Sequence, residues 1–199
     1  MQKVKKKEKF SILTLPIRKR LGILENKKVL ALYNAGLTPF RATILSVLFK
    51  LATIYLIFLN KFIFASIAII LDYAFDVLDG MLARAANKTT KEGKYIDIGT
   101  DVGLRRLNYL IIAYNGLVSY PLALITLASM LVNPSLVYLA DKAKIKRNKY
   151  IVIGGDMFLL FFALLTGKFL FFFYLIIIAN IVILILNLLS MAYLNLIKK

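Results

Sequence analysis

Apolar residues fill six stretches of the chain that are long enough, or nearly long enough, to cross a membrane as helices. Crossing the hydrocarbon core takes about 20 helical residues. The connectors between the stretches are short, so consecutive helices are expected to pack antiparallel. We therefore predict an all-α integral membrane protein with six transmembrane helices in a single membrane domain, residues 1–199. The stretches are 42–59, 62–83, 94–117, 121–141, 150–166 and 169–196.

Residues 16–37, ahead of the first apolar stretch, place basic and apolar residues at roughly helical spacing. This pattern predicts an amphipathic helix that lies in the membrane interface, although a purely positive anchor would have the same charges. Gly36 is expected to end this helix, and Thr38 and Pro39 to begin the first span as its N-cap and first helical residue. Residues 1–15 are then a basic tail, and residues 38–199 a six-helix transmembrane bundle. No removable signal peptide is expected.

The composition agrees with a membrane protein, because 60% of the residues are hydrophobic. The chain has no Cys and no His, which excludes disulfides and metal sites made of thiolates or imidazoles. A net charge of +17 could indicate nucleic-acid binding, but the basic residues are spread among apolar stretches, so no nucleic-acid partner is expected. Most Lys and Arg residues fall on one side of the predicted bundle, while the opposite connectors hold only Lys61 and Lys168. Both termini are therefore predicted to be cytoplasmic, in a multi-pass protein of the cell membrane.

Four carboxylates are concentrated at one level of the predicted bundle. Asp76 and Asp79 share one face of the second stretch, and Asp97, Asp101 and Arg105 follow at four-residue intervals along the third. Such a group of anions would be strained by repulsion unless a cation neutralised it. Ligands that are all oxygen favour Mg²⁺, Mn²⁺ or Ca²⁺ over zinc, and four carboxylates can hold two ions. Two ions of this kind can bridge a diphosphate and neutralise the charge of a leaving phosphate.

The segment from Asp76 to Asp101 resembles the signature of the CDP-alcohol phosphatidyltransferases at every fixed position. It reads D-V-L-D-G-M-L-A-R, then eight residues, Gly93, three residues, Asp97, three residues and Asp101. The resemblance implies an enzyme of phospholipid biosynthesis that transfers a phosphatidyl-type group, or its ether-lipid equivalent, from a CDP-activated lipid to a polar alcohol and releases CMP. It also implies two bound Mg²⁺ or Mn²⁺ ions and a homodimer.

The same resemblance implies roles for individual residues. The two ions would be bound by the four carboxylates, Asp76, Asp79, Asp97 and Asp101. Asp101 would also be the catalytic general base for the acceptor hydroxyl. The CDP group would be bound by the other fixed positions of the signature, which are Gly80, Ala83, Arg84 and Gly93. A looser match at the start of the first span would add Pro39 and Thr43. A helix start alone would equally explain Pro39 and Thr43.

The acceptor is predicted from the cations near the carboxylates. Arg105 and Arg106, together with Lys146 and Arg147 of the basic connector, suit a phosphorylated alcohol, and inositol phosphate is the preferred interpretation. Glycerol phosphate or another alcohol is the alternative. Simple ion pairing of Arg105 and the positive-inside rule would explain the same charges. A divalent cation transporter is a distant alternative, since acidic side chains on facing helices also pass ions, but it requires neither Arg84 nor the glycines.

Asp72 and Lys50 are further charged residues inside the predicted spans that lie outside the signature. Asp72 precedes Asp76 by four residues, so it lies on the same face, about 6 Å farther from the cytoplasm. We expect it to pair with Arg105 or Arg106 beneath the carboxylates, as the floor of the acceptor pocket. Lys50 is expected either to face the bundle interior or to extend its amine to the membrane surface.

Overall fold

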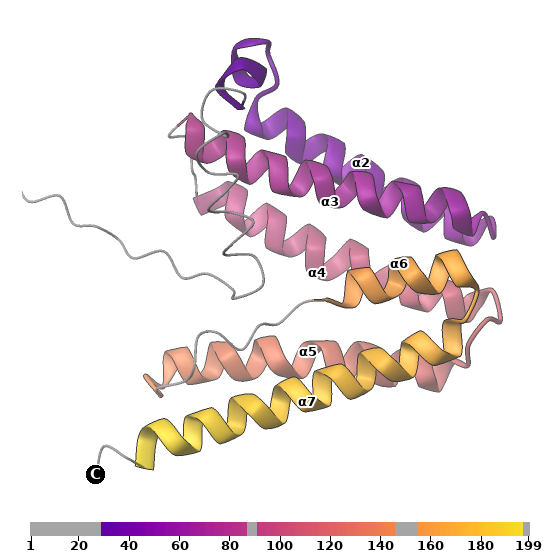
Figure 1. Cartoon of the computed structure of the whole chain (residues 1–199), viewed down its shortest axis with the longest axis vertical. Helices are drawn as coiled ribbons and strands as arrows, with labels where there is room; N and C mark the ends of the chain where they lie inside the picture. Colours follow the sequence, from indigo (N-terminus) through magenta and orange to yellow (C-terminus); the bar gives the residue numbers. More distant parts are fainter. Residues whose placement is uncertain (1–28, 87–90, 146–154, 197–199) are drawn as a thin grey trace, which may run out of the picture.

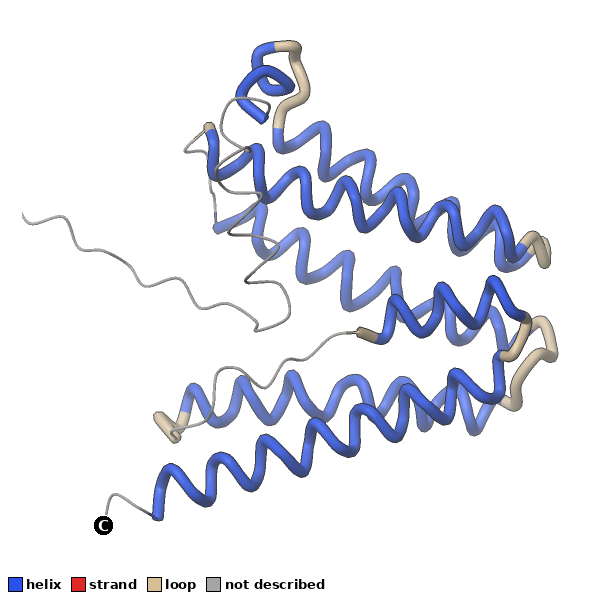
Figure 2. Tube along the Cα trace, in the orientation of Figure 1, coloured by secondary structure: helices blue, strands red, loops and turns tan. Residues whose placement is uncertain are grey.

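The computed structural model describes residues 29–86, 91–145 and 155–196, and within these the side chains of 91–98, 101 and 102 are not described. The described residues form helices, turns and connecting loops, with no strand among them (Figure 2). The predicted all-α class is therefore confirmed. The helices are α2 Pro39–Phe58, α3 Phe62–Ala85, α4 Lys91–Tyr114, α5 Tyr120–Lys142, α6 Asp156–Thr166 and α7 Phe169–Leu196.

Three of these helices, α2, α5 and α7, are long and apolar enough to cross a membrane. Helix α3 has 24 residues, but aspartates interrupt its apolar sequence. Helix α6 has 11 residues, about 16 Å, and residues 150–154 of the fifth predicted span lie outside the described part. The structure thus supports a helical membrane protein, while the count of six spans stays a prediction.

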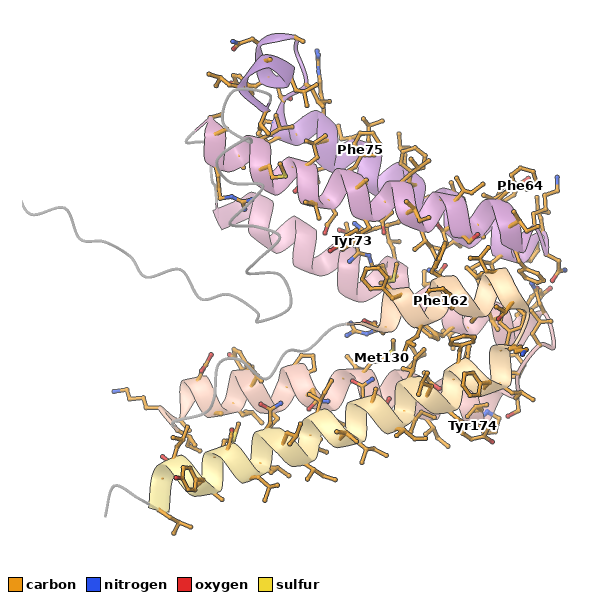
Figure 3. All side chains as sticks on the ribbon, in the orientation of Figure 1. Phe64, Tyr73, Phe75, Met130, Phe162 and Tyr174 are labelled. Carbon is orange, nitrogen blue, oxygen red and sulfur yellow. The ribbon has the colours of Figure 1, made fainter. Side chains whose placement is uncertain are left out.

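The helices form two groups (Figure 1). Helices α2, α3 and α4 lie side by side in one group, α5 and α7 pair in the other, and α6 packs against both α3 and α7 between them. Neighbours in sequence run in opposite directions, as predicted from the short connectors. The buried apolar core lies at the end of the molecule where α6 joins the groups, and includes Ile57, Tyr109, Leu160 and Phe173. Figure 3 shows the labelled ring of Tyr73 on α3 beside α6, where its centroid lies 5.7 Å from that of Phe158.

The start of α2 has the capping residues expected from the sequence. Residues 29–34 are helical, and Gly36 follows them with a φ of +97°. The amide of Leu37 donates to the Leu32 carbonyl and that of Gly36 to the Tyr33 carbonyl, which is the hydrogen-bond pattern of a Schellman cap. Thr38 then accepts from the Arg41 amide as the N-cap of α2. The predicted helix end at Gly36 is therefore confirmed, while residues 16–28 lie outside the described part and the position of this helix in the membrane interface stays a prediction.

Candidate functional site

Helix α3 carries a ladder of three carboxylates, Asp72, Asp76 and Asp79, on one face. Their spacing of four and three residues places them in successive turns of the helix. Asp72 and Asp79 are buried, and the side chain of Asp76 is 27% exposed. An uncompensated carboxylate at such depth is very costly, so each needs partners from neighbouring helices.

Helix α2 supplies partners from one face of its own. Thr43, Ser46 and Lys50 follow at intervals of three and four residues, and α2 packs along α3. The Thr43 hydroxyl donates to Oδ2 of Asp79 at 2.9 Å, and the Ser46 hydroxyl donates to Oδ1 of Asp72 at 2.8 Å. Because the two helices are antiparallel, the first of these three α2 residues, Thr43, meets the last aspartate of the ladder.

Two cations lie against the deeper part of the ladder. Lys50 is 3% exposed, and its Nζ is 3.3 Å from Oδ1 of Asp72 and 3.9 Å from Oδ1 of Asp76. The Nε of Arg105, on α4, is 3.1 Å from Oδ2 of Asp72, and its Nη2 is 3.7 Å from Oδ1 of Asp76. Asp72, at 1% exposure, therefore contacts both cations and the Ser46 hydroxyl. Its burial cost is offset by these partners together.

These contacts decide two of the sequence predictions. The ion pair beneath the carboxylates is confirmed, and Arg105 rather than Arg106 makes it. Lys50 faces the bundle interior instead of extending to the surface. The roles of Ser46 and of Lys50 as partners of the ladder were not predicted. A signal for them existed in the sequence, because Thr43, Ser46 and Lys50 form a polar stripe along a mostly apolar helix.

The remaining signature residues lie on α3 and α4. Gly80, Ala83 and Arg84 occupy the last turns of α3, where Arg84 is exposed. A Cβ atom at position 80 would lie 3.4 Å from Nη1 of Arg84, so the arginine side chain extends over the glycine. Three further predicted site residues belong to helix α4, namely Gly93, Asp97 and Asp101. Their four-residue spacing continues to Arg105, so all four positions lie along one face of the helix.

The structure describes some of the other predicted site residues and leaves others outside the described part. The side chains of Asp97 and Asp101 lie outside the described part, as do Lys146 and Arg147. Pro39 opens α2 one turn before Thr43, and Thr43 contacts Asp79. Arg106 is half-buried on α4.

The chemistry of the ladder suits a hard divalent cation. Asp76 and Asp79, one turn apart, present only carboxylate oxygens, the ligand type that Mg²⁺ and Mn²⁺ prefer. Among the described residues no group of three or more acidic, His or Cys side chains converges on a cation position. The two carboxylates needed to complete the predicted set belong to Asp97 and Asp101, outside that part.

Comparison with known proteins gives the same assignment as the signature. A family model for CDP-alcohol phosphatidyltransferase matches residues 36–194. Over 97 residues the chain is 36% identical to the archaetidylinositol phosphate synthase of Pyrococcus horikoshii, covering 48% of this chain and 51% of that protein. The matched region thus spans about half the length of that relative. No solved structure matches the chain.

Proposed function

Because the chain belongs to the CDP-alcohol phosphatidyltransferase family, we propose that it transfers a phosphatidyl-type group, or its ether-lipid equivalent, from a CDP-activated lipid to inositol phosphate. The observation that carries the proposal is the aspartate ladder of α3 inside the matched region, with Asp76 and Asp79 one turn apart. The Pyrococcus relative, named an archaetidylinositol phosphate synthase, supports inositol phosphate as the acceptor. Transfer to glycerol phosphate is the alternative within the same reaction class.

The metal site of the proposal consists of Asp76 and Asp79 on α3 with Asp97 and Asp101 on α4. Two Mg²⁺ or Mn²⁺ ions bound there would neutralise the charge that the diphosphate carries. Gly80 and Gly93 have no side chain that would keep the CDP group from the helix backbones, and Arg84, whose side chain extends over Gly80, would offer its cation to a phosphate at the exposed end of α3. Ala83 in the last turn of α3, together with Pro39 and Thr43 in the first turns of α2, would complete the CDP site.

Asp101 acts as the general base in this proposal. Its carboxylate takes the proton of the acceptor hydroxyl, and the resulting oxygen attacks the phosphorus on the lipid side of the diphosphate. A new phosphorus–oxygen bond forms to the acceptor, and the bond from that phosphorus to the bridging oxygen breaks. The electron pair of the broken bond leaves with CMP.

The acceptor phosphate would be bound by Arg105 and Arg106 with Lys146 and Arg147. Arg105 is held by Asp72, and its side chain remains 15% exposed, so it is not fully buried. We place the site, with both termini, on the cytoplasmic side because the basic residues gather there. We also propose that the protein forms a homodimer in the cell membrane.

The test is a CMP-release assay on the purified enzyme in detergent, with one CDP-lipid and a panel of acceptors. We expect release with inositol phosphate that stops in excess chelator and returns with Mg²⁺ or Mn²⁺ but not Zn²⁺. A reaction without acceptor is the control for hydrolysis. Full activity in chelator would refute the metal-dependent mechanism. Faster release with glycerol phosphate than with inositol phosphate would make glycerol phosphate the acceptor. Metal flux in liposomes without CMP release would favour the transporter.

A further inference from the structure

Lys50, Asp72 and Arg105 form a buried triad that joins three helices beside the proposed metal site. Asp72 on α3 contacts Lys50 of α2 through Oδ1 at 3.3 Å and Arg105 of α4 through Oδ2 at 3.1 Å. The Ser46 hydroxyl lies within 2.8 Å of both Oδ1 of Asp72 and Nζ of Lys50. The positions of both cations are therefore set by Asp72.

Both cations also reach the next carboxylate of the ladder. Lys50 and Arg105 approach the same oxygen of Asp76, Oδ1, at 3.9 and 3.7 Å. Charges this close interact strongly in a partly buried site, where screening by water is weak. Two positive charges beside Asp76 restrain its carboxylate and oppose the approach of further positive charge.

We propose that this triad positions Asp76 and sets the cation affinity of the site, with Asp72 as the residue that holds Lys50 and Arg105 in place. The inference rests on the proposed function, because it takes Asp76 as a metal ligand. The triad leaves the site less attractive to a divalent cation than its carboxylates alone would make it. Lys50 and Asp72 are positioning residues here and touch no substrate.

Two substitutions should shift cation affinity in opposite directions. Lys50→Met removes a positive charge beside Asp76, so Mn²⁺ should bind more tightly, by roughly tenfold. Asp72→Asn keeps the shape of the side chain but removes a negative charge, so Lys50 and Arg105 repel the ion and Mn²⁺ should bind more weakly by a similar factor. Damage to the structure would weaken binding in both variants.

The measurement is Mn²⁺ binding to the full-length protein in detergent, followed by the electron paramagnetic resonance signal of free Mn²⁺ without any CDP-lipid. Lys50→Arg should bind like the wild type because it keeps the charge. Lys61→Met is the matched control, since Lys61 is exposed in the connector at the far end of α2 and α3. The readout involves no turnover, so failure of the proposed reaction and failure of the triad are seen separately.

Opposite shifts in the two variants, with Lys50→Arg and Lys61→Met unchanged, support the proposal. Unchanged affinity, or weaker binding in both variants, overturns it. Arg105→Gln gives the same test if Lys50→Met does not fold, because Arg105 reaches the same oxygen of Asp76. If neither neutral variant folds while Lys50→Arg does, the cations serve folding and the proposal is wrong.

Discussion

The hydrogen bond between Thr43 and Asp79 connects the start of α2 to the last aspartate of the ladder. The Thr43 hydroxyl is 2.9 Å from Oδ2 of Asp79 and 3.2 Å from the Pro39 carbonyl. It has one proton, and the nearer, ionised oxygen is the stronger acceptor. Thr43→Val keeps the branched shape of the side chain but removes this donor, so Asp79 loses a partner that fixes its orientation.

The expected loss follows from the strength of such a bond. A hydrogen bond to a charged group contributes about 1.5–3 kcal/mol. If Asp79 needs this bond in the transition state, kcat/KM falls by about 10- to 100-fold, since about 1.4 kcal/mol corresponds to a factor of ten. The assay is CMP release at limiting CDP-lipid, with the amount of folded enzyme checked by gel filtration.

Two further variants make the result decisive. Thr43→Ser keeps the hydroxyl and should recover most of the activity. Thr53→Val makes the same chemical change two to three turns along α2, where the hydroxyl bonds only to the Phe49 carbonyl of its own helix, at 2.8 Å. It should leave kcat/KM near that of the wild type. Wild-type activity in Thr43→Val, or an equal loss in Thr53→Val, would refute the role of the bond.

Three other predictions concern the base, the acceptor and the fold. Asp101→Asn should abolish CMP release while Mn²⁺ and CDP-lipid binding partly survive, because the amide keeps an oxygen ligand but takes no proton at neutral pH; near-normal turnover would remove Asp101 as the base. Asp72→Ala should raise the acceptor KM more than that of the CDP-lipid, and Arg105→Ala more strongly still; an unchanged acceptor KM would exclude Arg105 as a phosphate ligand held by Asp72. Gly36→Ala should destabilise the protein by about 1–2 kcal/mol, measured by thermal unfolding in detergent, because a φ of +97° is costly for any residue with a Cβ; an unchanged unfolding midpoint would contradict this.

The features that the sequence predicted well are those fixed by spacing within one helix. The aspartate ladder depends only on helical periodicity, as does the stripe of Gly93, Asp97, Asp101 and Arg105. The Gly36 cap depends on a local conformation that few residues other than glycine adopt. The sequence also predicts that Asp72 meets an arginine of the third span, because antiparallel helices bring together residues at the same depth in the bundle.

The features that the sequence missed depend on how helices are rotated and shifted relative to one another. Arg105 and Arg106 lie at nearly the same depth, so only the rotation of α4 decides which one meets Asp72. The stripe of Thr43, Ser46 and Lys50 was visible, but nothing in a single sequence fixes which face of α2 meets α3. The sequence therefore leaves two alternatives for Lys50 and does not indicate a role for Ser46.

The charges of the site divide into two levels. At the deeper level the negative charges of Asp72 and Asp76 are matched by the positive charges of Lys50 and Arg105, so these four described side chains are neutral together. Neutrality is what allows four charged side chains to be mostly buried together. At the level nearer the C-terminal end of α3, Asp79 accepts a hydrogen bond from a neutral hydroxyl, and the proposed function adds Asp97 and Asp101 there. Together with Asp72, the four proposed ligand carboxylates carry five negative charges, and Lys50 and Arg105 offset two of them. Two divalent ions carry more positive charge than the three negative charges that remain, and the diphosphate of a CDP-lipid would supply the missing negative charge. The proposed site therefore favours binding of metal and donor together, which the Mn²⁺ affinity with and without CDP-lipid would measure.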